Sequence, residues 1–227
     1  MAAQPLTSWK LVQVLGHQRY LALSLLAYLV IAPFMQEQYE GSRLLAYGVL
    51  TLVFITGPLA VARTRITLIA TFVLALLVLL PGLASARGEF EEAYRYSLLA
   101  GILFFSFLAG LLIREFLVQS TEVDSETLWG AVNIYILIGL CFAFWYAALD
   151  LFVPGLFSGH FVEATNRDQL MGFIYFSFVT LTTLGYGDIT PSVTWVATLN
   201  YLEAVIGQLY VAIVIARLVS LYLARRD

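Results

Sequence analysis

Long uncharged apolar stretches alternate with short charged segments along the chain. A bilayer core is about 30 Å thick and is crossed by about 20 helical residues, so each stretch is a candidate span. Read from charge to charge, the candidates lie at residues 20–36, 44–62, 66–86, 96–113, 127–149, 169–187 and 189–216, the last interrupted by Glu203 alone. The pattern predicts an all-α membrane protein.

The sixth candidate differs from the others because its C-terminal end is not a helical sequence. Thr180, Thr182 and Thr183 precede Gly185 and Gly187 there, and β-branched residues and glycines at this density favour helix termination. Backbone that is not helical is tolerated at membrane depth only where protein covers it or where it lines a watery path. We therefore expect six transmembrane helices, with a re-entrant segment between the fifth and the sixth.

The positive charges support six spans and place both termini in the cytoplasm. With six spans, eight lysines and arginines lie on the side of the termini and four lie opposite, which fits the positive-inside rule; with seven spans the tally would be five against seven. The eight are Lys10, Arg19, Arg63, Arg65, Arg114, Arg217, Arg225 and Arg226, and the four are Arg43, Arg87, Arg95 and Arg167.

Composition excludes several classes of protein. The chain has 12% charged residues, whereas a soluble domain has about 25%, so a water-soluble globular protein is excluded. A net charge of -3 without any basic block leaves no electrostatic basis for nucleic-acid binding. The single cysteine, Cys141, excludes both a disulfide within the chain and a cysteine metal cluster.

The most specific motif is the string T-T-L-G-Y-G-D at residues 182–188, which resembles the selectivity filter of potassium channels. A dehydrated K⁺ ion needs oxygens in place of its water shell. Successive carbonyls face one axis only if the backbone alternates in handedness, and glycine reaches positive φ without steric cost. The predicted K⁺ ligands are therefore the carbonyls of Thr183, Leu184, Gly185 and Tyr186 and the Thr183 hydroxyl, with Gly185 and Gly187 supplying the turns.

The resemblance extends over roughly residues 128–224 and implies a pore helix from about Gln169 to Thr182. Thr165, Asn166 or Asp168 could cap this helix, whose carboxyl end favours a cation. One chain supplies one strand of a carbonyl ring, so a ring of four identical chains is the closed solution. The implied partners are K⁺, the lipid bilayer and three identical subunits, with no cofactor besides the bound ions.

Thr182, Asp188, Tyr175 and Phe176 are the predicted supports of the filter. In the family, two tryptophans commonly occupy the positions that match Tyr175 and Phe176, and Phe176 has no donor for the Tyr186 hydroxyl. Tyr175 could still bond Asp188. The aromatic run of the pore helix is expected to pack around Tyr186, although plain core packing is an alternative for its members, Phe173, Tyr175, Phe176 and Phe178.

The last helix carries the remaining candidates. Gly207 falls where simple two-helix channels place a hinge glycine, and a bend and close helix packing both explain a glycine inside a helix. Glu203 is the ionisable residue in the middle of this span, and it serves either a structural role behind the filter or proton-sensitive gating. The same match to two-helix channels implies that Gln208, Val211 and Ile215 face the cavity and that Ile215 and Val219 lie near the cytoplasmic constriction.

Six spans with the filter between the last two resemble the voltage-gated cation channel superfamily. The fourth stretch, residues 96–113, lacks the arginines of a voltage sensor, so the membrane potential has no charge to act on there. The resulting organisation is a cytoplasmic segment (1–19), a four-helix transmembrane domain (20–117), a cytoplasmic linker (118–127) and a pore domain (128–227).

The sequence thus predicts a homotetrameric potassium channel of the cell membrane, without covalent chemistry. A weakly selective or nonconducting cation-channel relative is the first alternative. A membrane enzyme that uses His160, Glu163 and Asp168 is the second, but their spacing matches no helical ligand pattern and no nucleophile is paired with a base.

Overall fold

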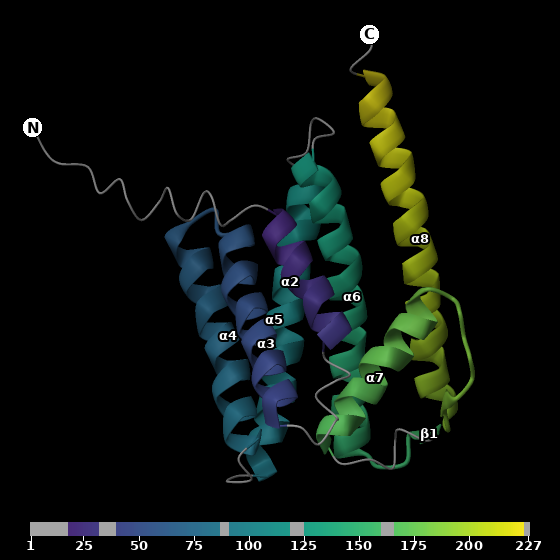
Figure 1. The fold of residues 1–227 in the computed structure, drawn as a ribbon. Coiled ribbons are helices and arrows are strands. Elements are labelled where there is room, and N and C mark those ends of the chain that lie inside the picture. Colours follow the sequence, from purple (N-terminus) through teal and green to yellow (C-terminus); the bar gives the residue numbers. More distant parts are fainter. Residues whose placement is uncertain (1–17, 32–39, 87–90, 119–124, 160–165, 225–227) are drawn as a thin grey trace, which may run out of the picture.

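The computed structural model describes residues 18–31, 40–86, 91–118, 125–159 and 166–224. Within these ranges the chain forms seven helices and a short antiparallel pair of strands (Figure 1). The helices are α2 (Gln18–Ile31), α3 (Glu40–Val61), α4 (Arg65–Ala86), α5 (Glu91–Val118), α6 (Ser125–Phe152), α7 (Asn166–Leu181) and α8 (Thr194–Ala224), and the strands are β1 (Phe157–Gly159) and β2 (Ile189–Pro191).

Four helical segments of the described chain are long and apolar enough to cross a membrane. They are Arg65–Leu83, Glu92–Leu117, Ser125–Phe152 and Thr194–Ser220, in α4, α5, α6 and α8. The described parts of the first two predicted spans are shorter apolar helices, Gln18–Ile31 and Gly48–Val61. The protein therefore passes the membrane several times, and the full count of six stays a prediction.

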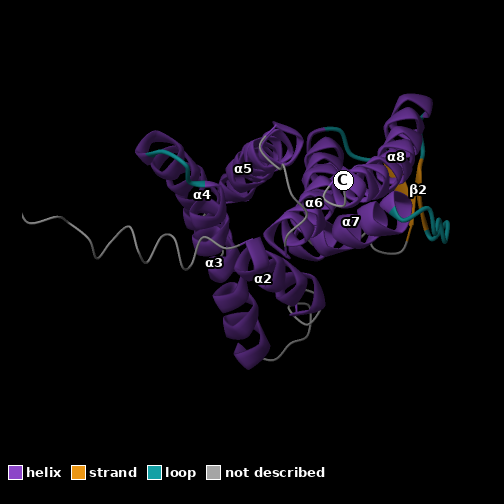
Figure 2. Ribbon diagram, turned by 90° about the horizontal axis from the view of Figure 1, so that it is seen from above, coloured by secondary structure: helices purple, strands orange, loops and turns teal. Residues whose placement is uncertain are grey.

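Helix α6 lies between the four preceding helices and the C-terminal elements. Seen from above, α2 to α5 gather on one side of α6, while α7, α8 and the strands occupy the other (Figure 2). Interlocked aromatic rings join α3, α5 and α6: the centroids of Phe54 and Phe104 are 5.1 Å apart, and those of Phe105 and Phe144 are 5.0 Å apart. Edge-to-face and tilted ring pairs of this kind contribute about 0.5–1.5 kcal/mol each.

Helix α7 does not run the length of the bundle. It ends at Leu181 beside the middle of α8, and the chain then returns to the end of the bundle where α7 begins (Figure 1). There β2 pairs with β1, with Phe157 opposite Pro191. This is the re-entrant course that the glycines and threonines of residues 180–187 favour, and α7 lies within a few residues of the predicted pore helix.

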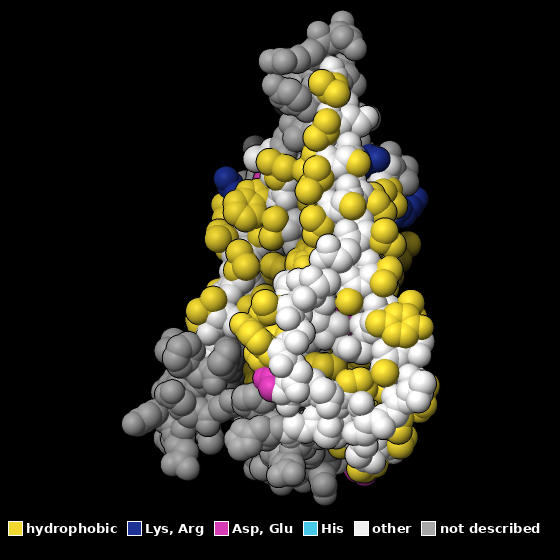
Figure 3. Space-filling model, turned by 90° about the vertical axis from the view of Figure 1, so that its right-hand side faces the viewer, with side chains coloured by type: hydrophobic (Ala, Val, Ile, Leu, Met, Phe, Trp, Pro, Cys, Tyr) yellow, Lys and Arg dark blue, Asp and Glu magenta, His cyan; other side chains and the backbone are white. Residues whose placement is uncertain are grey.

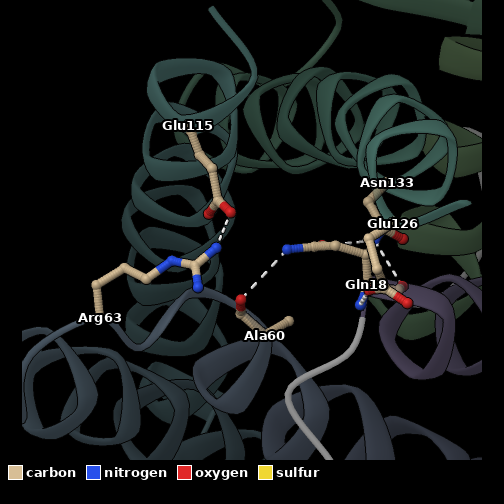
Figure 4. A network of polar contacts seen from close by, with 6 residues as sticks. All are labelled: Gln18, Ala60, Arg63, Glu115, Glu126 and Asn133. Atoms are coloured by element: carbon tan, nitrogen blue, oxygen red, sulfur yellow. Dashed lines mark hydrogen bonds and ion pairs between the residues drawn. The ribbon is translucent and has the colours of Figure 1, made fainter. Parts of the chain in front are cut away.

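A buried polar cluster joins α2 to α6 near the start of both helices (Figure 4). The amide of Asn133 donates to the backbone carbonyl of Gln18 at 2.8 Å and to its side-chain oxygen at 3.0 Å. The backbone N–H of Gln18 donates to Glu126 at 2.6 Å, which satisfies a donor at the start of α2 that has no partner within the helix. The Gln18 amide also reaches the carbonyl of Ala60 in α3 at 3.2 Å. These bonds fix the register between the first helices and α6.

A second junction ties the far end of α8 to the end of α5. Arg217 donates to the carbonyl of Leu117 at 3.1 Å, and its guanidinium carbon lies 5.2 Å from the centre of the Phe116 ring. A cation at the C-terminal end of a helix interacts favourably with the helix dipole. An ion pair between Arg63 and Glu115 joins α3's end to α5 close to the same level (Figure 4).

Candidate ion-conducting site

The backbone of the filter string alternates in handedness. Gly185 and Gly187 have φ values of 57° and 76°, the left-handed conformation that the motif predicts for them. Thr183 also has a positive φ, of 59°, although it is β-branched. A β-branched residue in this region is an outlier that persists only where its surroundings hold it. Alternation therefore begins at the threonine, one step earlier than the glycines alone indicate.

Three N–H groups of this segment donate to carbonyls at the end of α7. The N–H groups of Leu184 and Gly185 donate to the carbonyl of Val179 at 2.9 and 3.2 Å, and that of Thr183 donates to Thr180 at 2.8 Å. Within the described residues, no donor bonds to the filter carbonyls of Thr183, Leu184, Gly185 and Tyr186. A carbonyl oxygen needs a hydrogen-bond donor or a cation as its partner. A row of carbonyls without donors is therefore suited to binding a cation.

The outer end of the filter is held by a bond to the pore helix. The Tyr175 hydroxyl donates to the Asp188 carboxylate at 2.6 Å. The other carboxylate oxygen accepts the N–H of Ile189 at 3.1 Å, at the start of β2. Asp188 thus joins α7, the filter and the strand pair at one point.

We expect Tyr175→Phe to weaken this end of the filter. The substitution removes a hydrogen bond to a charged group and leaves the ring in place. The expected result is a K⁺ flux from liposomes that declines severalfold faster than wild type when external K⁺ is low. Tyr201→Phe, at an exposed tyrosine of α8, is the matched control. Equal decay in wild type and Tyr175→Phe would remove the supporting role of this bond.

The buried aromatics of α7 do not surround Tyr186 in the single chain. The rings of Phe173 and Phe176 pack against Phe157, with centroids 4.8 and 5.7 Å apart, and against Tyr146 at 6.5 and 5.2 Å. Tyr186 itself is 66% exposed. Phe176 therefore supports the pore helix from behind rather than the filter directly, because β1 and α6 bring their rings to the same face of α7.

Glu203 is fully buried where α6, α7 and α8 meet. The Tyr146 hydroxyl donates to one carboxyl oxygen at 2.7 Å, and the Ser177 hydroxyl lies 2.5 Å from the other. Ser177 also contacts the carbonyl of Gly139 in α6 at 2.7 Å. Sequence reasoning did not single out Tyr146 or Ser177. The rule that buried charged or polar groups have partners demands such residues but does not identify them.

Gly207 is the point of closest approach between α8 and the end of α7. A Cβ at this position would lie 2.2 Å from the carbonyl oxygen of Leu181. Helix α8 continues through Gly207, from Thr194 to Ala224. Of the two explanations that the sequence leaves open, the structure supports close packing.

The predicted cavity residues lie on exposed parts of α8 beyond the filter. The amide of Gln208 donates to the Thr183 hydroxyl at 3.3 Å. Val211, Ile215 and Val219 are each about half exposed in the single chain. Thr182 turns back to the pore helix, donating to the carbonyl of Phe178 at 2.7 Å.

Some predicted residues cannot be placed. Thr165, His160 and Glu163 lie outside the described residues, as does most of the predicted linker, 119–124. Asn166 is the first residue of α7, which includes Asp168, but the structure does not describe the side chains of these two residues.

Comparison with known proteins assigns the C-terminal part of the chain. Residues 134–224 match the family described as Ion channel, a range that contains most of α6, all of α7, the filter string and α8. No curated protein and no solved structure matches the chain. The matched family is one of channels and not of enzymes, so the membrane-enzyme alternative is dropped. Residues 134–224 are an ion channel pore domain in a multi-pass membrane protein.

Proposed function

We propose that the protein is a homotetrameric potassium channel of the cell membrane. K⁺ passes through rings formed by the carbonyls of residues 183–186 and by the Thr183 hydroxyl, and no covalent step is involved. The observation that carries this proposal is the backbone of residues 183–187. The N–H groups of residues 183–185 donate to α7, no donor among the described residues bonds to the carbonyls of residues 183–186, and φ is positive at residues 183, 185 and 187. In the proposed ring of four, such a backbone would supply oxygens at close intervals along one axis.

The exposed residues of the single chain support assembly. Leu184 and Tyr186 are 56% and 66% exposed, although both are large and apolar or aromatic. Hydrophobic side chains follow α8 over most of its length on the face beside the filter (Figure 3). In a ring of four, each filter would pack against the pore helix of its neighbour, and these side chains would be covered by protein or lipid.

The proposed topology has six spans with both termini in the cytoplasm. Helix α2 begins and α8 ends at the same end of the bundle (Figure 1). This supports a topology in which both termini lie on one side of the membrane. The four-helix unit of residues 20–117, without sensor arginines, then packs against one side of a pore domain of residues 128–227 through the contacts of α6.

Reconstitution of the purified chain into liposomes with opposed K⁺ and Na⁺ gradients tests this function. We expect the reversal potential to lie near the K⁺ equilibrium potential and Ba²⁺ to block the flux. A reversal potential near zero would mean equal permeability and would favour the weakly selective alternative. Absence of any flux at all K⁺ concentrations would favour the nonconducting one. The mass of the particle in detergent, measured by light scattering, checks for four chains.

A further inference from the structure

The inner end of the filter depends on one residue of α8 that faces it. Thr183 is β-branched and has a φ of 59°, a conformation that its own chemistry disfavours. Its backbone N–H is fixed by the carbonyl of Thr180 at 2.8 Å. The described contact of its side chain is with the amide of Gln208 at 3.3 Å. The described contact that orients the hydroxyl therefore comes from α8 and not from α7.

The neighbouring glycine makes this contact possible. Gly207 has no side chain, and the space of its missing Cβ is occupied by the carbonyl of Leu181, 2.2 Å away. Helices α7 and α8 are therefore close enough for Gln208 to reach Thr183. Gly207 thus allows α8 to approach the end of α7, and the adjacent Gln208 makes the hydrogen bond to Thr183.

The amide leaves the threonine oxygen free to bind an ion. If Gln208 donates an N–H, the hydroxyl oxygen uses one lone pair and keeps the other; if the amide is turned over and its oxygen accepts the hydroxyl hydrogen, both lone pairs remain. In each orientation the hydroxyl is held at one end and open at the other. Leucine or valine at position 208 would leave the hydroxyl free to rotate.

We propose that Gln208 is the positioning residue for the innermost oxygen ring of the filter, and that it sets the ion preference of that ring by fixing the Thr183 hydroxyl. This inference rests on the proposed potassium conduction. The residue does not bind the ion itself; it acts through Thr183.

Variants of the full chain in liposomes test the proposal, with Ba²⁺ as a divalent probe of the inner ring. We expect Gln208→Leu and Gln208→Asn, whose shorter amide cannot reach, to raise the half-blocking Ba²⁺ concentration about tenfold, which is about 1.4 kcal/mol summed over the ring of four chains. The K⁺ over Na⁺ permeability ratio should fall severalfold in both. Gln208→Glu, which has the same reach and can accept from the hydroxyl, should retain the K⁺ over Na⁺ permeability ratio, a readout in which the added charge acts on two ions of equal charge. Leu223→Ala, at an exposed position about four turns along α8, is the remote control.

A double-mutant cycle separates this role from general support. In a Thr183→Ala background, Gln208→Leu should change Ba²⁺ block no further, because the hydroxyl on which it acts is gone. Additive effects in the cycle would overturn the proposal, as would wild-type block and selectivity in both Gln208→Leu and Gln208→Asn. If the wild-type chain itself fails to distinguish K⁺ from Na⁺, the proposed function fails instead, and that result is seen before any variant is measured.

Discussion

Gly207→Ala is expected to abolish most of the K⁺ flux and to lower the stability of the assembled protein. The added methyl group would lie 2.2 Å from the carbonyl oxygen of Leu181 and 3.0 Å from a methyl group of its side chain. The leucine side chain can move, but the carbonyl belongs to the end of the pore helix. Overpacking of this kind costs about 1–3 kcal/mol, and here the displacement shifts the filter that follows Leu181.

The measurements are K⁺ flux from liposomes and the thermal unfolding midpoint in detergent. Gly110→Ala is the matched control, because a Cβ at Gly110 of α5 meets nothing within 4 Å and alanine favours a helix by up to about 1 kcal/mol. The two readouts also separate packing from bending. A hinge role would lower flux in Gly207→Ala without lowering the unfolding midpoint, whereas the close contact requires both to fall. Unchanged flux and an unchanged midpoint would contradict the contact itself.

Removal of the Glu203 carboxyl is expected to have the second large effect. Glu203→Leu leaves the buried hydroxyl of Tyr146 without its acceptor, and an unsatisfied buried donor costs about 1–3 kcal/mol. The same change disconnects α8 from Ser177 of α7. We expect a lower unfolding midpoint and severalfold less K⁺ flux.

Glu203→Gln is expected to behave nearly as wild type, which is the sharper half of this prediction. Three contacts join Glu203, Tyr146, Ser177 and the Gly139 carbonyl, and each needs a hydrogen, but the two hydroxyls supply only two. A proton on Glu203 would supply the third, and a glutamine amide supplies it equally well while still accepting from Tyr146. If Glu203→Gln is as damaging as Glu203→Leu, the group acts as a carboxylate and this count of hydrogens is wrong.

Proton-sensitive gating at Glu203 stays a separate hypothesis. It requires the pH dependence of single-channel opening to differ between wild type and Glu203→Gln. Indistinguishable curves would leave Glu203 with a structural role alone, as a link between α6, α7 and α8.

Much of the pore region can be predicted from the sequence because its chemistry is local. The positive φ at Gly185 and Gly187 follows from the absence of a Cβ, and the end of α7 follows from the threonines and glycines after it. The bond between Tyr175 and Asp188 could be foreseen as a possibility, since the two residues are only 13 positions apart in the chain. These features depend on residues near one another in the chain.

The contacts behind the filter could not be predicted in the same way. Tyr146 and Ser177 lie 57 and 26 positions from Glu203. Each stands in an apolar helix, where a tyrosine or a serine is indistinguishable by sequence from an ordinary core residue. The turning of Phe176 toward Tyr146 and Phe157 likewise depends on where β1 and α6 place their rings. No periodicity of apolar residues in α7 distinguishes the face toward residues 182–188 from the face toward α6.

The sequence by itself determined that the chain crosses a membrane and where helix α7 ends, because length, charge and glycine act through the local backbone. Only the tertiary structure decided that Gly207 serves as a contact point, that Gln208 reaches Thr183, and that Glu203 is shared by three helices. Those outcomes arise from the distance between helices far apart in the chain, and that distance is set by the packing of all of them together.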